Sequence, residues 1–460
     1  MASISDRVSN LPLGKFHWRL LVLIGSGIAF EALDTALIAF VLAKMIGSWN
    51  VTPVQMGYIG SAALVGMCLG AICSGTLADR IGRKAMFAAT LAVYSVGTAL
   101  CAFSWNLESL LAFRFIVGFG VGGQPPVANA MMSEYAPAKH RGKMLVLQNC
   151  SWAVGWLVAS LISYLVIPKF GWQLAFAIGA APALLVAYIY KIMPESAMYL
   201  VSKGRYQEAH EEVAKIEREL GVPVGEPPLP SEIPTVAVGK TISFFDLWKP
   251  TFIRRTVCLW ILWFGIVFAY YGMFTWLPSL LVKSGFNLVK SFEYMMWMTC
   301  AQVPGYFAAA YLVDKIGRRA TLGSFLAVTA LAAYMFGGAK SVPEIMLWGC
   351  MISFFNLGAW GICHAYSAEQ YPTYARATGV GWAAAFGRTG GIIAPIVVGW
   401  LMTGPDKIPT VFLMFTAVLA VVAADIIFLG RETMNKSLDE LTAADTVPAP
   451  APAATRVDGK

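Results

Sequence analysis

The sequence predicts an all-α membrane protein in which twelve transmembrane helices form two pseudo-symmetric bundles of six. Three observations support this fold class. Of the 460 residues, 58% are hydrophobic and 13% are charged, and the mean hydropathy is +0.64, which leaves too little polar surface to cover a water-soluble globule of this size. Apolar stretches of about 20 residues, the length that crosses a bilayer as helix, recur from Trp18 to Gly430.

An internal repeat is the third observation. Residues 75–84 contain an acid, a glycine and a basic run, and residues 310–319 repeat them in register. The same offset relates further pairs: Asp79 with Asp314, Gly82 with Gly317, Glu134 with Glu369, Pro137 with Pro372, and Arg141 with Arg376. Two halves built on one plan explain this register.

The chain divides into four parts. The first half, residues 1–193, holds predicted spans near 18–41, 54–78, 85–104, 107–131, 143–167 and 173–192. In its fourth span, Gly118, Gly120, Gly122 and Gly123 predict close contact with neighbouring helices. A polar connector, 194–254, predicts short surface helices and a flexible proline-rich piece. The second half, 255–430, holds spans near 255–282, 291–313, 320–337, 343–367, 377–402 and 408–429, and we expect the tail, 431–460, to be disordered.

The charge distribution predicts how the chain lies in the membrane. Most lysines and arginines occur on the side that carries both termini, both repeated stretches and the connector, so this side should face the cytoplasm. The net charge of +8 therefore serves orientation, and we expect no nucleic-acid partner. The eight cysteines lie in apolar segments without a CxxC pair, which predicts packing residues and no metal. Without a nucleophile–base set or a phosphate-binding loop, we expect neither an enzyme nor a cofactor.

Several motifs resemble one superfamily of transporters. The stretch 75–84 resembles the major facilitator superfamily signature after the second helix. Arg114 with the glycines behind it, Glu134 and Arg141, and the Pro-Glu-Ser run at 194–196 are similar to the branch of sugar porters, organic ion transporters and synaptic vesicle glycoprotein 2 relatives. The resemblance covers nearly the whole chain. It implies two halves that rock about a site at their interface near the membrane midplane.

The repeated charges have a structural explanation. They lie at predicted cytoplasmic helix ends, where carboxylates can pair with guanidinium groups and accept hydrogen bonds from helix N-termini. We therefore interpret them as a cytoplasmic gate rather than as substrate contacts. The gate residues are Asp79, Arg83, Glu134, Arg141, Asp314, Arg318, Glu369 and Arg376.

Three charges break the repeat and are more informative. The offset carries Asp34 onto Ala269, Arg114 onto Gly349 and Arg388 onto Ala153. An ion at membrane depth costs several kcal/mol unless it is paired, so each of these charges is a candidate functional residue.

Asp34 and Arg114 are predicted to meet. Each lies roughly 25 Å from the cytoplasmic end of its helix at about 1.5 Å per residue, so the two can pair. The pattern around Asp34 resembles the first helix of proton-coupled sugar porters, which implies that Asp34 carries the proton and Arg114 sets its affinity. A static buried ion pair is the alternative. Glu31, one turn earlier, is a second proton candidate.

Arg388 is the predicted anion anchor. It lies near mid-membrane in the eleventh span, and its fork-shaped guanidinium suits a carboxylate. Aromatic faces and hydrogen-bonding tips around one cation describe a site for a small planar organic anion. The predicted binding residues with Arg388 are Asn356, Trp360, Tyr270, Tyr271 and Gln302. Alternatively, Arg388 pairs with Asp425 and the aromatic side chains only pack.

The whole pattern is most similar to bacterial nicotinate (niacin) permeases, with aromatic acid:proton symporters next. Tyr270 and Tyr271 stand where sugar porters place paired glutamines, which argues against a sugar. The resemblance implies a proton-coupled importer of a small organic monocarboxylate, nicotinate first, that works as a monomer in a bacterial inner membrane. The alternatives are a hydroxybenzoate-type symporter, a sugar porter and a non-transporting membrane receptor.

Overall fold

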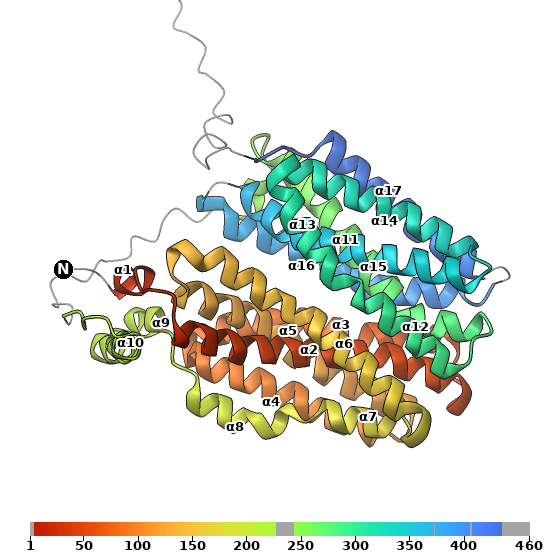
Figure 1. Cartoon of the computed structure of the whole chain (residues 1–460), viewed down its shortest axis with the longest axis horizontal. Coiled ribbons are helices and arrows are strands. Elements are labelled where there is room, and N and C mark those ends of the chain that lie inside the picture. The colour runs from red at the N-terminus through yellow and green to blue at the C-terminus, as the bar shows by residue number, and fades with distance from the viewer. Residues whose placement is uncertain (1–3, 227–242, 372, 405–406, 435–460) are drawn as a thin grey trace, which may run out of the picture.

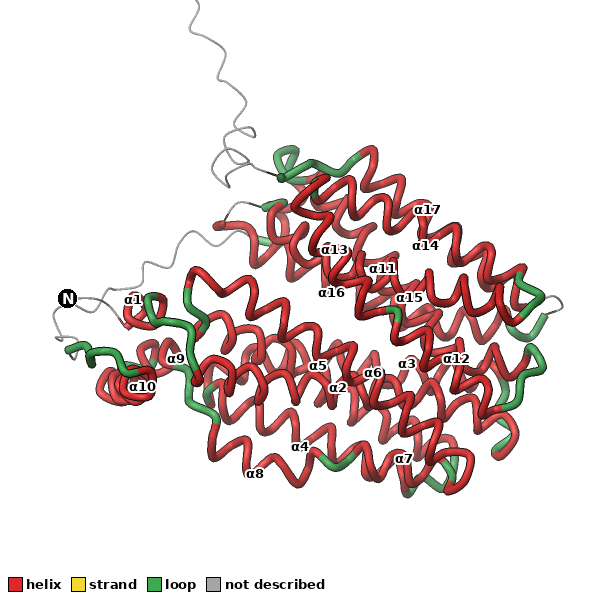
Figure 2. Tube along the Cα trace, in the orientation of Figure 1, coloured by secondary structure: helices red, strands yellow, loops and turns green. Residues whose placement is uncertain are grey.

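In the computed structural model, residues 4–226, 243–371, 373–404 and 407–434 are described. These residues form helices joined by short turns, and no strand occurs among them (Figure 2), as the sequence predicted. The proline-rich piece at 227–242 and the tail at 435–460 lie outside the described residues.

The helices follow the predicted order (Figure 1). The first half contains α1 (Ile4–Ser9), α2 (Lys15–Ser48), α3 (Pro53–Ile81), α4 (Arg83–Ala102), α5 (Leu107–Tyr135), η1 (Ala138–His140), α6 (Arg141–Phe170), α7 (Trp172–Gly179) and α8 (Pro182–Ile192). The connector contains α9 (Ala197–Ser202), α10 (Tyr206–Leu220) and η3 (Phe244–Trp248). The second half contains α11 (Ile253–Lys283), α12 (Leu288–Cys300), α13 (Gln302–Ile316), α14 (Arg318–Gly338), α15 (Val342–Glu369), α16 (Thr373–Leu401) and α17 (Lys407–Phe428).

The described residues hold eleven helical segments that are long and apolar enough to cross a membrane. Of the twelve predicted spans, the eighth, near residues 291–313, is not among these eleven segments. It is interrupted at Ala301, where α12 ends and α13 begins. The sixth span is interrupted as well, between α7 and α8. Neither break was predicted, because small residues continue the apolar pattern through both sites.

The turns that join the helices lie at two ends of the molecule. We call the end with the turns at Gly82 and Gly317 the motif end, and the opposite end, which carries the turn between α2 and α3, the far end. Figure 1 shows α1, α9 and α10 at the motif end. Gly82 (φ 99°) and Gly317 (φ 94°) adopt a positive φ, which glycine tolerates without a Cβ clash, and so let α4 and α14 begin directly after the preceding helix. At the far end, Thr52 caps α3, because its hydroxyl oxygen accepts a hydrogen bond from the backbone N–H of Gln55.

The glycines of α5 bring three helices together, as predicted. A Cβ atom added at Gly118 would lie 1.8 Å from the carbonyl oxygen of Ala63 in α3. One added at Gly120 would lie 2.5 Å from the backbone nitrogen of Tyr94 in α4. Since real Cβ atoms do not approach so closely, only glycine allows α5 to touch both neighbours.

The two bundles contact each other toward the far end. In α11, residues 265–281 are buried all round, whereas the part of α11 nearer the motif end is exposed on one side. Phe40 of α2 packs edge-on against Phe292 of α12 with ring centroids 5.1 Å apart. Ser61 of α3 donates a hydrogen bond to the carbonyl oxygen of Ile392 in α16, 2.6 Å away. The far-end halves therefore form a closed interface.

Candidate functional site

Asp34 and Arg114 form an ion pair inside the first bundle. The Arg114 Nη1 atom lies 3.0 Å from Asp34 Oδ2, and both residues are almost completely buried. Thr98 of α4 donates its hydroxyl hydrogen to Asp34 Oδ1 at 2.6 Å. The carboxylate thus receives one donor on each oxygen, which satisfies its buried acceptors. A cavity of about 20 Å³, room for roughly one water molecule, adjoins this pair and Tyr271.

Glu31 lies one helical turn before Asp34 and is oriented toward the second bundle. It is 1% exposed, and its Oε2 atom has no hydrogen-bond partner. The positive charge that acts on this carboxylate is that of Arg388 on α16, and the Tyr271 hydroxyl senses both groups. Glu31 on α2 and Arg388 on α16 therefore lie near enough, on different bundles, for their charges to interact.

Asp425, the alternative partner considered for Arg388, lies elsewhere. Its carboxyl group is buried in α17 against the thiol of Cys258 in α11. The half-buried Arg388 guanidinium instead lies on the side of α16 that faces the first bundle.

The predicted aromatic residues gather on α11 and α15. The Tyr270 ring lies 5.2 Å from the Tyr271 ring and 5.2 Å from the Trp360 ring, measured between centroids. Tyr270 also accepts a hydrogen bond across the bundle interface, from Trp152 Nε1 on α6 at 2.9 Å. Aromatic faces and one hydroxyl thus line the interface close to the level of Arg388.

Two predicted amides are buried without partners. Gln302 begins α13 and Asn356 lies in α15, and both are 0% exposed. Neither the nitrogen nor the oxygen of either amide makes a hydrogen bond in the structure. Buried polar groups are nearly always paired in proteins, so these two amides require an explanation.

At the motif end of the first bundle, the gate residues Arg83 and Glu134 form a cluster with Glu195 and Ser196, which we call a corner. Arg83 Nε lies 3.5 Å from Glu134 Oε1. Glu195 caps the start of α4, because its Oε1 atom accepts the backbone N–H groups of Arg83 at 2.9 Å and Lys84 at 3.1 Å. The Ser196 hydroxyl donates to Glu134 and completes the corner.

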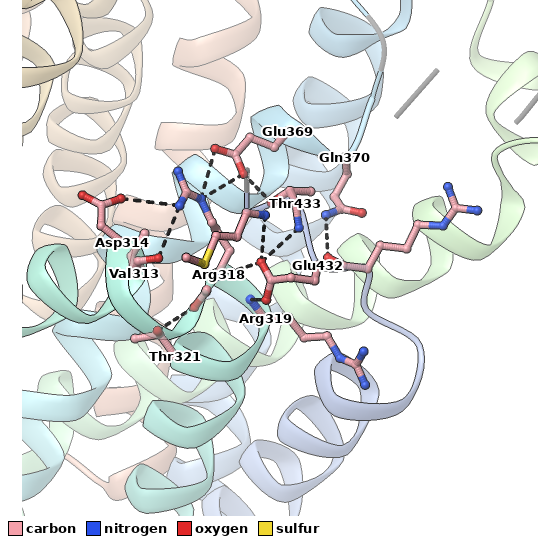
Figure 3. Close-up of polar contacts among 12 residues, drawn as sticks. Val313, Asp314, Arg318, Arg319, Thr321, Glu369, Gln370, Glu432 and Thr433 are labelled. Atoms are coloured by element: carbon pink, nitrogen blue, oxygen red, sulfur yellow. Dashed lines mark hydrogen bonds and ion pairs between the residues drawn. The ribbon is translucent and has the colours of Figure 1, made fainter. Parts of the chain in front are cut away.

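The second bundle builds the same corner (Figure 3). Arg318 Nε lies 3.3 Å from Glu369 Oε2. Glu432 caps the start of α14 and accepts the N–H groups of Arg318 at 2.9 Å and Arg319 at 3.1 Å. The Thr433 hydroxyl donates to Glu369, as Ser196 does to Glu134.

The remaining gate candidates are placed less tightly. Asp314 lies 3.4 Å from Arg318, but its side chain is 77% exposed. Arg141 begins α6, and Arg376 lies in the first turn of α16; both are partly buried. The side chain of Asp79 lies outside the described part of the chain. The described pairs Arg83–Glu134 and Arg318–Glu369 each join residues of one bundle.

Sequence reasoning missed several members of these clusters. Thr98, the second partner of Asp34, carries no signal of its own in an apolar span. Glu432 and Thr433 were assigned to the disordered tail, but residues 431–434 are docked on the second bundle. The run Arg-Glu-Thr at 431–433 mirrors Pro-Glu-Ser at 194–196, but it lies two residues out of the register that relates the other pairs.

Comparisons with known proteins agree with this architecture. The family model described as "Sugar (and other) transporter" matches residues 24–444. The niacin transporter NiaP of Acinetobacter baylyi is 54% identical, with 95% of this chain and 99% of that protein covered. The benzoate transport protein of the same organism is 29% identical, with 87% of each chain covered.

A solved structure matches over the same extent. The xylose transporter XylE from E. coli, in a partially occluded inward open conformation, superposes with a TM-score of 0.75 at 17% identity, covering 92% of this chain and 100% of that chain. At this level of identity the match concerns the fold.

Proposed function

Because the chain belongs to the sugar (and other) transporter family, whose model spans most of its length, we propose that it imports nicotinate together with protons by alternating access. Family membership confirms the prediction of a transporter rather than an enzyme. The niacin transporter at 54% identity supports the choice of substrate. A multi-pass membrane protein follows from the eleven apolar segments, and we propose the bacterial inner membrane with both termini in the cytoplasm.

The observation that carries this proposal is the position of Arg388. Its guanidinium is permanently charged and close enough to the Tyr271 hydroxyl to act on it electrostatically, and the glycines that follow it, Gly390 and Gly391, bring α16 against Phe264 and Tyr271 of α11. Nicotinate is planar and negatively charged. Its carboxylate would bind Arg388, and its ring would lie against the aromatic side chains of α11 and α15.

Substrate binding and proton binding would be coupled, because the substrate carboxylate and the Glu31 carboxylate compete for Arg388. In the substrate-free protein, the charge of Arg388 would stabilise Glu31 as a carboxylate against the cost of its burial. When the substrate carboxylate binds Arg388 instead, Glu31 loses its counter-charge and would accept a proton, since a buried, unpaired carboxylate is costly. Uptake of one anion with one proton moves no net charge, so the pH gradient would drive it.

Asp34 is the alternative acceptor of that one proton, and it would couple the proton to the rocking motion. Protonation of its carboxylate would remove the charge that holds Arg114 and shift the balance between the two transporter conformations. The two corners at the motif end would then act as the cytoplasmic gate, because their ion pairs connect the helices that must move together. We propose that one chain suffices for this cycle.

Uptake of labelled nicotinate into proteoliposomes tests the proposal. The wild-type protein should accumulate nicotinate when the outside is acidic. Asp34→Asn should lose this accumulation and retain exchange of internal for external nicotinate. Binding without any flux would contradict transport and favour a receptor, and intact accumulation by Asp34→Asn would remove Asp34 as the proton carrier.

A further inference from the structure

Four aromatic side chains form a layer between the bundles, which we call the aromatic layer. Its members are Trp152 on α6, Tyr270 on α11, Tyr306 on α13 and Trp360 on α15. Trp152 donates to the Tyr270 hydroxyl at 2.9 Å, the Tyr270 and Trp360 rings lie 5.2 Å apart, and the phenol of Tyr306 is close enough to act electrostatically on that of Tyr270. Helices of both bundles therefore meet at this level.

A second layer lies one helical turn closer to the far end. Residues four apart on a helix share a face, so each member of the aromatic layer has a neighbour in it. These neighbours, which we call the amide layer, are Trp156, Phe274, Gln302 and Asn356. The Trp156 and Phe274 rings lie 5.7 Å apart across the bundle interface, which confirms that α6 and α11 also meet at this level.

The two amides come from helices in backbone contact. A Cβ atom added at Gly305 of α13 would lie 2.2 Å from the carbonyl oxygen of Phe354 in α15, and one added at Gly358 would lie 3.0 Å from the carbonyl oxygen of Gly305. Such close packing places Gly305 level with Asn356, so Gln302, three residues earlier in α13, lies within about one helical turn of Asn356 in height. Both are completely buried, and all four of their polar atoms lack a hydrogen-bond partner.

An unpaired buried carboxamide is unfavourable in an otherwise apolar layer, and two of them together need an explanation. The transport roles derived above for Arg388, Asp34 and Glu31 do not use either amide. A carboxamide NH₂ group can donate to a ring nitrogen, whose lone pair lies in the plane of the ring. A benzene ring offers no acceptor there.

We propose that Gln302 and Asn356 recognise the ring nitrogen of a pyridine carboxylate and so distinguish it from a benzene carboxylate. This inference rests on the proposed function, because the carboxylate is held by Arg388 and the ring by the aromatic layer. The ring nitrogen points into the amide layer and accepts a hydrogen bond from one or both NH₂ groups. A benzoate in the same pose leaves the amides unpaired, which lowers its affinity.

Binding of four ligands to the full-length protein in detergent separates the two recognition elements. Nicotinate and nicotinamide share the pyridine ring, whereas benzoate and benzamide share the benzene ring. Calorimetry should give wild-type protein at least about tenfold tighter binding of nicotinate than of benzoate. Gln302→Met and Asn356→Leu should each weaken nicotinate severalfold and leave benzoate unchanged, so that the ratio falls toward one.

Gln124→Met is the matched control. Gln124 of α5 is also an amide that is 0% exposed with both polar atoms unpaired, but it packs against Gly27 and Phe87 inside the first bundle. This variant should keep the wild-type ratio. Retained benzoate binding shows that each amide-layer variant is folded.

The outcomes separate this inference from the proposed function. An unchanged ratio of nicotinate to benzoate in both Gln302→Met and Asn356→Leu overturns the inference, as does equal weakening of both acids. Failure of Arg388→Gln to weaken the acids overturns the anion anchor, and it does so whatever the ratio between the rings.

Discussion

At the motif end of the first bundle, Glu195 caps α4 and Ser196 donates to Glu134; in the second bundle, Glu432 caps α14 and Thr433 donates to Glu369. The two corners match contact for contact. Near mid-membrane the bundles differ. The first holds the buried Asp34–Arg114 pair, and the second holds Arg388, whose counterpart in the first is Ala153.

This difference indicates which residues serve the conformational change and which serve binding of substrate and proton. A transporter whose two halves rock against each other needs each half to keep its helix ends together. The corner of ion pairs and helix caps in each bundle meets this need. A substrate with a carboxylate at one end has no two-fold symmetry, so the groups that bind it and its proton need not repeat. We therefore propose that the unrepeated charges mark the site and that the repeated ones mark the gate.

Breaking the mid-membrane pair should have the largest effect. Arg114→Met leaves Asp34 buried without its counter-charge, and the loss of one partner of a buried pair costs about 3–5 kcal/mol. Thermal unfolding should shift down markedly and uptake should be lost. The double variant Arg114→Met with Asp34→Leu should regain most of the stability without regaining uptake, and a double variant as unstable as Arg114→Met would show that the pair is not the cause.

The two corners should lose equal stability when the glutamate that caps the helix is neutralised. Glu195→Gln and Glu432→Gln each weaken charge-assisted bonds to two backbone N–H groups, and each should cost about 2 kcal/mol. Turnover of nicotinate exchange should fall in both, with little change in the affinity for substrate. If one variant behaves as wild type and the other does not, the equivalence of the corners is wrong.

A contact between α1 of the first half and α10 of the connector should depend on pH. Arg7 of α1 donates to Glu217 of α10 at 2.9 and 2.6 Å and contacts His210 Nδ1 at 2.9 Å. Burial raises the pKa of Glu217, but bonds from Arg7 and the Gly225 N–H outweigh it, so the pKa lies below its ordinary value. Burial and the charge of Arg7 lower the pKa of His210.

Both shifts weaken the docking of α1 in acid. Below about pH 6.5, histidine takes up a proton when α1 is undocked, whereas the docked His210 resists protonation, so docking becomes less favourable. Below about pH 4.3, the contribution of Glu217 to docking is lost as well. Hydrogen exchange of α1 should therefore be faster at pH 5.5 than at pH 7.5. Arg7→Ala should raise it at both pH values, by about 1–2 kcal/mol of docking energy. The control Arg19→Ala breaks an exposed pair with Glu219 and should change little.

The smallest effect is expected at Asp314. Its side chain is 77% exposed, so its pairing with Arg318 is worth less than about 0.5 kcal/mol. Asp314→Asn should leave unfolding and nicotinate exchange almost unchanged. A loss as large as that of Glu432→Gln would mean that Asp314 contacts another partner in a different conformation.

Much of this arrangement was predictable from the sequence, because the bilayer fixes span length and the repeat fixes the halves. The Asp34–Arg114 contact followed from equal depth along two helices. The helix break at Ala301 did not follow, since apolar periodicity continues through it. Glu432 was missed because its corner lies two residues out of register, and Thr98 because a hydroxyl in an apolar span reveals its partner only after the helices pack.

The affinity of purified protein for nicotinate, measured in wild type and in Arg388→Gln, tests the central claim most directly. If Arg388 binds the carboxylate between the bundles, the substitution should weaken nicotinate about 30-fold or more, and it should leave neutral nicotinamide nearly unaffected. Equal affinity of the two proteins for nicotinate would contradict the account.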